Sequence, residues 1–198
     1  MTRPLAVVVL AAGLGTRMKS RVPKMLHEAA GRPLLEHVLR AVQPLAPDKI
    51  LVVVGHGAGA VRERFAAYPA TFVVQEEQLG TGHALLQCRP ELADFGGEVL
   101  VVNGDMPLLT TETLQALLAR QHETRAAMSL VTCEVAEPDG LGRIVRKADG
   151  SVAAIVEEKD AGPRERAIRE INPGAYLFGP DVFKRIQELS NDNAQGEY

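Results

Sequence analysis

The sequence contains little cysteine. Cys88 and Cys133 are the only two, and they stand far apart in apolar stretches. No Cys-x-x-Cys pair and no Cys/His spacing typical of a zinc site accompanies them, so a disulfide framework and a zinc centre are both unsupported. We therefore expect two buried free thiols, as is usual for a protein of the reducing cytoplasm.

An excess of positive charge and a long apolar run are also missing. The formal net charge is -3, which opposes a general nucleic-acid binder, because such proteins contact many phosphates with Lys and Arg. No stretch approaches the roughly 20 apolar residues of a membrane span. The short apolar run Leu5–Ala12 has only Arg3 ahead of it, unlike a secretory signal. The sequence therefore predicts a cytoplasmic protein without a nucleic-acid or membrane partner.

Apolar runs and helical stripes alternate along the first part of the chain. Continuous valine-rich runs at Leu5–Ala11, Ile50–Val54 and Val99–Val102 are typical of strands buried on both faces of a parallel sheet. Leucines and valines at helical spacing within 34–42 and 114–118 predict amphipathic helices, the second starting after Thr110. This alternation predicts an α/β fold with a doubly wound, mostly parallel Rossmann-like sheet.

The pattern changes after Ala126. Shorter segments follow that favour strands, with Asp149-Gly150 as a tight hairpin turn: Met128–Glu134, Arg143–Lys147, Ser151–Glu157 and Ala175–Phe178. With 198 residues, 46% of them apolar, and no internal repeat or long linker, the chain suits one domain with a small added β subregion.

The loop after the first strand is strongly basic. Arg17, Lys19, Arg21 and Lys24 fall within eight residues that contain no acid. Open α/β sheets bind ligands outside the carboxyl ends of their strands, which is where this loop lies. A solvated basic loop is one interpretation. The other is a long loop whose backbone N–H groups and cations hold a triphosphate.

Two familiar glycine-rich loops fit this segment poorly. The dinucleotide fingerprint G-x-G-x-x-G and the P-loop G-x-x-x-x-G-K-[ST] both require a glycine where this chain has Met18. Pro23 also stops the helix that a P-loop needs. A P-loop kinase is thus the weakest of the enzyme hypotheses.

Leu10-Ala-Ala-Gly-Leu-Gly-Thr-Arg-Met18, followed by Pro23-Lys24, resembles the signature of sugar-1-phosphate nucleotidyltransferases. Further stretches resemble the bacterial N-acetylglucosamine-1-phosphate uridyltransferase family, which forms the N-terminal half of a bifunctional enzyme. They are Pro33–Val38, Gln75 with Gln78–His83, Gly104-Asp105, Gly140–Ile144, Glu157–Asp160, Glu170–Asn172 and Asn193–Tyr198. The resemblance runs from Leu5 to the last residue.

The resemblance implies a Mg2+-dependent enzyme of cell-wall precursor synthesis. It would transfer a uridylyl group from UTP to N-acetylglucosamine 1-phosphate, giving UDP-N-acetylglucosamine and pyrophosphate. Residues 1–125 would bind mainly the nucleotide and residues 126–198 the sugar. A related nucleotidyltransferase with another sugar or base is one alternative, and a catalytically inactive UDP-sugar-binding fragment is another.

The resemblance also assigns roles to single residues. Arg17 and Lys24 would bind phosphates, and Asp105, which follows a buried strand, would hold Mg2+ through a hard oxygen ligand. The nucleotide would be bound by Leu10, Ala11, Ala12, Gly13, Gln75, Gly80, Thr81, Asn103 and Gly104, and the sugar by Gly142, Glu157 and Asn172.

Several of these residues carry a second interpretation. Asn103 is expected to contribute mainly through its backbone, and Thr81 to cap the helix after it as well. Arg143, which lies inside one of these motifs, can be interpreted as a simple surface charge. The five histidines are expected to be structural, because no serine or cysteine nucleophile motif accompanies them.

The chain departs from the family pattern at its end. The family's uridyltransferase half continues past the Gly-Glu-Tyr motif, and a later asparagine there supplies a second metal ligand, whereas this sequence stops at Tyr198. It also lacks hexapeptide repeats, so neither an acetyltransferase β-helix nor a β-helix-driven trimer is expected. Asp105 is then the single expected protein ligand of Mg2+, with lowered turnover as the consequence.

Overall fold

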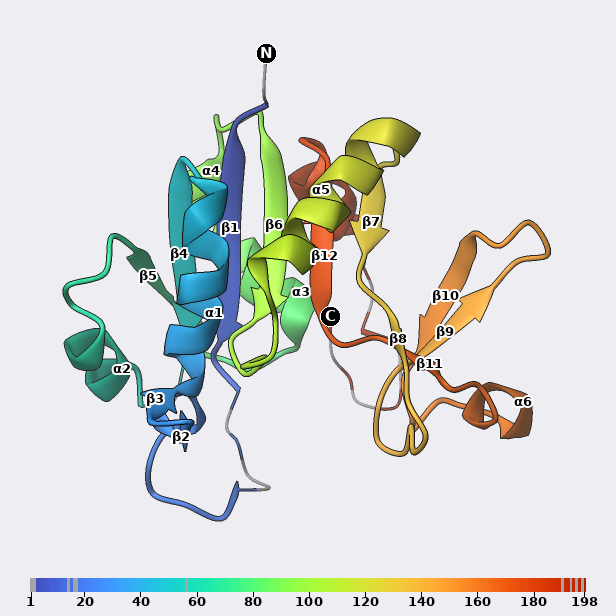
Figure 1. Ribbon diagram of the computed structural model, residues 1–198, viewed down its shortest axis with the longest axis horizontal. Coiled ribbons are helices and arrows are strands. Elements are labelled where there is room, and N and C mark those ends of the chain that lie inside the picture. The colour runs from blue at the N-terminus through green and yellow to red at the C-terminus, as the bar shows by residue number, and fades with distance from the viewer. Residues whose placement is uncertain are drawn as a thin grey trace.

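A six-stranded sheet forms the centre of the molecule, with strand order β5-β4-β1-β6-β12-β7 (Figure 1). The computed structural model describes residues 3–13, 15, 18–55, 57–189, 191–192, 194, 196 and 198. The strands are β1 (Leu5–Ala11), β4 (Lys49–Val54), β5 (Thr71–Val74), β6 (Glu98–Asn103), β7 (Met128–Leu130) and β12 (Ala175–Phe178). The first four run parallel, and β12 is antiparallel to both β6 and β7. The expected mostly parallel sheet is confirmed.

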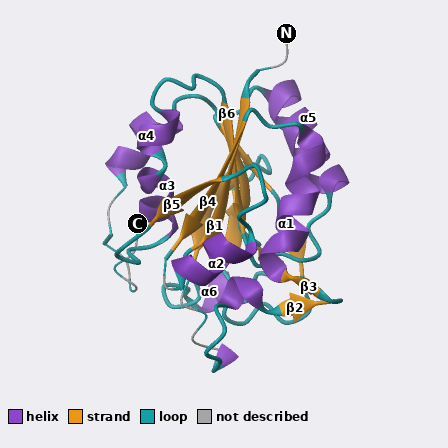
Figure 2. Ribbon diagram, turned by 90° about the vertical axis from the view of Figure 1, so that its left-hand side faces the viewer, coloured by secondary structure: helices purple, strands orange, loops and turns teal. Residues whose placement is uncertain are grey.

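Helices cover both faces of this sheet. Figure 2 shows α1 (Leu34–Val42) and α5 (Thr111–Thr124) on one side, and α3 (Thr81–Gln87) and α4 (Arg89–Leu92) on the other. Side chains of β1 alternate between the two cores: Val7 and Val9 pack under α1 and α5, whereas Ala6 and Val8 pack under α3 and α4. This two-sided burial explains why β1 reads as a continuous apolar run.

The two predicted helices have the expected local causes. In α1 the buried residues Leu35, Val38, Leu39 and Val42 follow helical spacing, and the helix begins directly after Pro33. At the start of α5, the Thr110 side chain accepts a hydrogen bond from the Thr113 N–H at 3.3 Å, a standard N-cap.

The remaining elements are short and lie around this framework. A four-stranded antiparallel sheet has the order β10-β9-β11-β8, and β2 pairs with β3. The strands are β2 (Glu28–Ala29), β3 (Arg32–Pro33), β8 (Cys133–Glu134), β9 (Arg143–Arg146), β10 (Val152–Val156) and β11 (Glu170–Ile171). The short helices are η2 (Lys24–Leu26), η3 (Gln43–Leu45), α2 (Ala58–Arg64), α6 (Pro163–Arg166), α7 (Val182–Arg185) and η4 (Ile186–Glu188). In the described part of the chain no helix is long and apolar enough to cross a membrane.

The segment 128–134 corrects one sequence prediction. It is two strands rather than one, because the backbone leaves the large sheet after Leu130 and joins the small sheet at Cys133. Residues beyond 126 thus serve both sheets, since β7 and β12 extend the large one.

The hairpin between β9 and β10 lies where it was predicted but uses a different turn. The Gly150 N–H donates to the Lys147 carbonyl at 3.0 Å, and the Lys147 N–H donates to Ser151 at 2.8 Å. Gly150, with φ +82°, is therefore the last of three loop residues rather than the second of two. Asp149 accepts hydrogen bonds from the N–H and hydroxyl of Ser151.

The two thiols differ, which corrects the expectation that both are buried. Cys88 is buried and Cys133 is exposed, and both are free. Burial, aided by the charge of Glu91, raises the pKa of Cys88 to about 12. Because the thiolate is the reactive species, Cys88 is inert in the folded chain.

Ellman's reagent at pH 8 should therefore titrate one thiol in the folded protein and two in denaturant. A Cys133→Ser variant should give no rapid reaction before unfolding. Rapid reaction of that variant would contradict the burial of Cys88.

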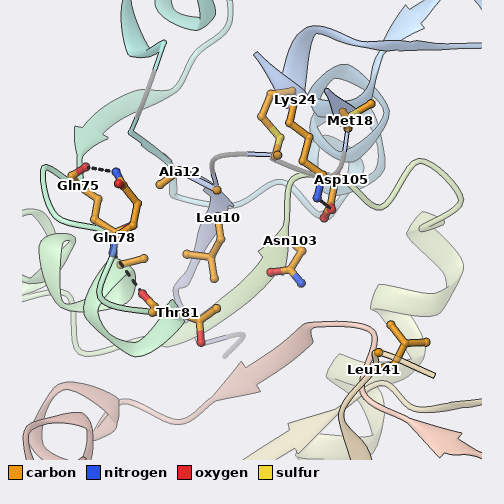
Figure 3. Close-up of a pocket in the computed structure, with 16 residues that line it drawn as sticks. Leu10, Ala12, Met18, Lys24, Gln75, Gln78, Thr81, Asn103, Asp105 and Leu141 are labelled. Atoms are coloured by element: carbon orange, nitrogen blue, oxygen red, sulfur yellow. Dashed lines mark hydrogen bonds and ion pairs between the residues drawn. The ribbon is translucent and has the colours of Figure 1, made fainter. Parts of the chain in front are cut away.

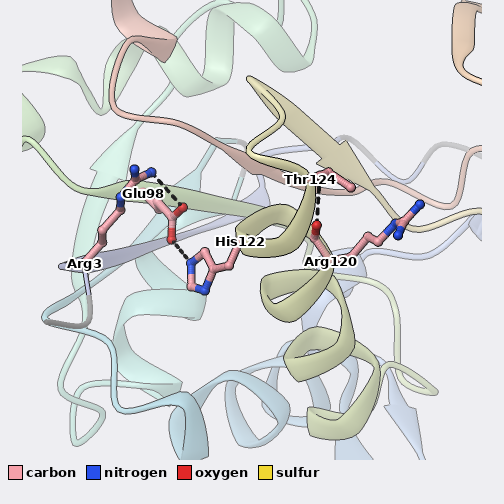
Figure 4. A network of polar contacts seen from close by, with 5 residues as sticks. All are labelled: Arg3, Glu98, Arg120, His122 and Thr124. Carbon is pink, nitrogen blue, oxygen red and sulfur yellow. Dashed lines mark hydrogen bonds and ion pairs between the residues drawn. The ribbon is translucent and has the colours of Figure 1, made fainter.

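A polar contact lies at the amino end of β6, opposite the carboxyl edge of the sheet (Figure 4). The Glu98 side chain is only 2% exposed and pairs with His122 Nε2 of α5 at 2.8 Å and with Arg3 at 3.5 Å. A buried carboxylate that loses its partner retains its desolvation cost.

We predict that His122→Ala lowers the free energy of unfolding by about 1–3 kcal/mol. Arg120→Ala on the same helix is the control, because the Arg120–Glu123 pair is exposed, and it should change stability by less than about 0.5 kcal/mol. Urea unfolding measures both; equal losses would show that the Glu98 contact adds nothing.

Candidate active site

A cavity of about 640 Å³ opens at the carboxyl edge of the large sheet (Figure 3). Loops that follow β1, β5 and β6 line it, together with the start of α3 and a loop from the β subregion. Its lining residues are Leu10, Ala12, Gly13, Gly15, Met18, Lys24, Met25, Gln75, Gln78, Gly80, Thr81, Ala84, Asn103, Asp105, Gly140 and Leu141. Nine of the predicted site residues are among them.

The basic loop reaches the cavity without forming a P-loop. After β1 the described chain enters η2 and the β2–β3 pair before its first α-helix begins at Leu34. Gly15 has φ +61°, and a Cβ there would lie 2.8 Å from Lys24 Cβ, so a glycine lets Lys24 cross the loop. The predicted phosphate ligand Arg17 lies outside the described residues.

Lys24 and Asp105 form an ion pair inside the cavity (Figure 3). Their side chains are 31% and 29% exposed, so a ligand can reach both charges. The loops that carry them are joined by backbone, because the Gly104 N–H donates to the Leu10 carbonyl at 2.8 Å. A Cβ on Gly104 would lie 3.1 Å from the Leu10 carbonyl oxygen and 2.9 Å from Met25 Sδ, so a glycine suits this close approach.

The first predicted nucleotide contacts differ in their accessibility. Ala12 and Gly13 line the cavity. The side chain of Ala11 lies in the core at 6% exposure, so Ala11 can act only through its backbone.

Gln75, Gly80 and Thr81 form the other wall. Gln75 is 3% exposed, and its Nε2 donates to the Gly80 carbonyl at 3.2 Å and lies 3.0 Å from His83 Nδ1. Gly80 has φ +102° and is itself the N-cap of α3. The expected cap by Thr81 is wrong: Thr81 is the first residue of the helix, and its side chain makes no cap bond. Its hydroxyl lies at the cavity instead.

Asn103 makes contacts within the protein through both its backbone and its side chain. Its backbone N–H donates to the Gly174 carbonyl at 3.0 Å and is thus already used within the protein. Its side chain lies at the cavity, where Nδ2 donates to Pro173 at 3.4 Å (Figure 3). Asn103 therefore joins the cavity to the segment 172–174.

The three predicted sugar residues lie together beside the cavity rather than in its lining. The Asn172 N–H donates to the Gly142 carbonyl at 2.9 Å. A Cβ on Gly142 would lie 2.7 Å from Glu157 Oε1, so the carboxylate lies against the glycine. The residues that directly follow β10 and β11 thereby meet the loop before β9 at one point.

Buried Arg143 anchors the loop 140–142, and its interpretation as a surface charge is wrong, since its exposure is 0%. Its guanidinium donates to the Leu141 carbonyl, to Ile168 at 3.1 Å, and pairs with Glu158 at 2.8 Å. The hydrogen bonds from Arg143 and from the Gly140 N–H lower the pKa of Glu158. This loop carries Gly140 and Leu141 to the cavity.

Gln78, Gly140 and Leu141 are lining residues that the sequence analysis did not single out. Each lies inside a motif quoted above, so the motif positions were the available signal. The choice among them depends on which side chains the fold turns inward.

The described histidines are held by structural contacts. His27 and His37 contact the carbonyls of Val22 and Ala29, and His83 lies between Gln75 and Gln87. His56 lies outside the described residues.

The donor set fits a magnesium ion that takes few ligands from the protein and most of them from water and phosphates. Among the described residues no group of three His, Cys, Asp or Glu side chains forms a complete metal site. Among the lining residues that the structure describes, Asp105 alone offers a carboxylate. Mg2+ often takes one or two carboxylates and fills its shell with water and substrate phosphates.

A family model described as the MobA-like NTP transferase domain matches residues 7–197. The chain belongs to this family. Curated relatives carry the name "Bifunctional protein GlmU". That of Listeria welshimeri is 50% identical over 192 residues, 96% of this chain and 42% of that protein. That of Pseudomonas aeruginosa is 51% identical over 195 residues, 98% of this chain and again 42% of the relative. The chain therefore spans less than half the length of these relatives.

Solved structures confirm the fold of this MobA-like domain. A putative glucose-1-phosphate thymidylyltransferase from Bacillus anthracis has a TM-score of 0.76 at 20% identity, covering 98% of this chain and 78% of the other. A UDP-glucose pyrophosphorylase complexed with UDP-glucose has a TM-score of 0.76 at 17% identity, with 98% and 83% coverage. The expected nucleotidyltransferase-type sheet is thus correct.

Two glycine variants test the loop geometry. Gly15→Ala should lower the free energy of unfolding by about 1–2 kcal/mol, because alanine is strained at positive φ. Gly13→Ala is the control: a Cβ there meets nothing within 4 Å, and stability should change little. Urea unfolding measures the stability of both variants. Equal stability would show that an alanine at position 15 is not strained and that Lys24 does not require a glycine there.

Proposed function

We propose that this MobA-like domain transfers a uridylyl group from UTP to N-acetylglucosamine 1-phosphate, releasing pyrophosphate and UDP-N-acetylglucosamine. The observation that carries the proposal is the convergence of Lys24, Asp105 and Gln75 on one cavity. The sequence identity of 50–51% to the GlmU proteins over nearly the whole chain supports the choice of sugar and base.

The reaction is a single displacement at phosphorus. An oxygen of the sugar's phosphate bonds to the α-phosphorus of UTP, while the bond to the oxygen bridging the α- and β-phosphates breaks. That electron pair leaves with pyrophosphate. Such transfers need positioning and charge neutralisation rather than protein nucleophiles.

Lys24 would neutralise phosphate charge. Its ammonium lines the cavity and is partly exposed, so it can meet phosphate oxygens as charge grows in the transition state. Arg17 would act on the leaving phosphates, and Asp105 would hold Mg2+. When bound, the ion would screen the phosphates and withdraw charge from them.

The nucleoside would lie along the wall formed by Gln75, Gly80 and Thr81. An amide offers both a donor and an acceptor, which suits the edge of a uracil ring. In the structure Nε2 of Gln75 contacts Gly80 and His83, which fixes the amide, so the acceptor Oε1 is the group that would meet the base. The segment 10–13, with Asn103 and Gly104, would enclose the other side.

The sugar would lie over Gly142, Glu157 and Asn172. Carboxylate and amide groups suit hydroxyl and acetamido groups. Their position beyond Asn103 leaves the cavity itself for the nucleotide, so residues 1–125 and 126–198 would divide the substrate between them.

Pyrophosphate release with UTP and N-acetylglucosamine 1-phosphate tests the proposal. We expect Mg2+-dependent release that falls at least about 100-fold in Asp105→Asn. Asp149→Asn, on the exposed hairpin turn, is the matched control and should keep the wild-type rate. Equal rates with glucose 1-phosphate would overturn the assigned sugar, and UDP-sugar binding without any release would reduce the domain to a binding module.

A further inference from the structure

Tyr176 lies behind the predicted sugar residues and has no role in the proposal above. It belongs to β12, where it pairs with Val101 of β6 and Leu130 of β7. Its ring packs against the core under α3 and stacks on Phe178, with ring centroids 6.0 Å apart. The ring is thus held by the sheet, and only the hydroxyl extends toward the sugar residues.

The hydroxyl of Tyr176 contacts one end of the Asn172 amide. Asn172 Nδ2 donates to it at 2.6 Å. At the other end, Asn172 Oδ1 accepts the Gly174 N–H at 3.2 Å. The terminal torsion of an asparagine is intrinsically broad, so an amide without such partners samples both orientations. With both partners present, the nitrogen and the oxygen each have a fixed place.

The chemical state of the hydroxyl suits this role. Burial, with a smaller contribution from the charge of Glu157, raises the pKa of Tyr176. The phenol is protonated at neutral pH, as an ordinary tyrosine is, and its oxygen accepts the Asn172 hydrogen bond. The phenol belongs to the same cluster as Gly142 and Glu157, because Asn172 contacts Tyr176 with its side chain and Gly142 with its backbone.

We propose that Tyr176 is a positioning residue for the sugar end of the site, holding the Asn172 amide so that its second Nδ2 hydrogen is presented to an oxygen of the sugar. This inference rests on the proposed function, because it assigns the sugar end to Asn172. Tyr176 itself would not touch the substrate. Its effect should pass entirely through the asparagine.

Tyr176→Phe is the direct test, since it keeps the stacked ring and removes only the hydroxyl. We expect the KM for N-acetylglucosamine 1-phosphate to rise about five- to tenfold, the range of one lost hydrogen bond. The KM for UTP should stay within about twofold, as should the urea midpoint. Tyr68→Phe is the matched control: Tyr68 packs edge-on against Phe65 under α2, away from the cavity, and should change neither KM.

A double variant separates positioning from general loosening. In an Asn172→Ala background, Tyr176→Phe should have no further effect on the sugar-phosphate KM, because the residue through which it acts is gone. Additive effects, or an equal rise in both KM values, would overturn the proposal. An inactive wild-type chain would instead refute the proposed function.

The hydrogen bond between Asn172 and Tyr176 can also be tested by NMR, without an activity assay. The side-chain NH2 resonances of Asn172, assigned by their loss in Asn172→Ala, should shift in Tyr176→Phe and stay in place in Tyr68→Phe. Unshifted resonances in Tyr176→Phe would overturn the positioning role, whatever the outcome of the assays.

Discussion

The parallel ladder of β1 between β4 and β6 is the constraint on which the other features depend. All three strands are buried on both faces, so their backbone polar groups must be satisfied within the sheet and their side chains must be apolar. Polar residues are then possible only where the strands end. Because parallel strands end at the same edge, the polar loops after β1 and β6 meet there, and the ion pair of Lys24 and Asp105 is one result.

Much of this framework could be predicted from sequence, because burial leaves a strong pattern. The run Leu5–Ala11 matches β1 to the residue, and the stripe within 34–42 matches α1. Segment 128–134 was misjudged, since where a short strand divides depends on which sheet accepts each half. The exposure of Cys133 follows from that division, and the apolar neighbours of a cysteine cannot reveal it.

The site was predicted unevenly for a related reason. Motifs identified the loops, and the fold brings most of the chosen residues to one cavity. The motifs did not show which atoms of each residue remain available to a ligand. Asn103 uses its N–H to hold Gly174, and Gly80 rather than Thr81 caps α3. Such assignments depend on hydrogen bonds between segments about 70 residues apart, or on one backbone torsion, and a sequence motif specifies neither.

Because Lys24 pairs with Asp105, a ligand of either side chain must compete with the other side chain for it. A metal ion that binds the Asp105 carboxylate by itself leaves the Lys24 ammonium without its partner. A phosphate that binds the ammonium by itself leaves the carboxylate without its partner. A metal–nucleotide complex carries both opposite charges and satisfies both groups in one event. Under the proposed function, the ion pair would thereby favour the complete metal–nucleotide complex over either component alone by charge balance, before any contact with base or sugar is made.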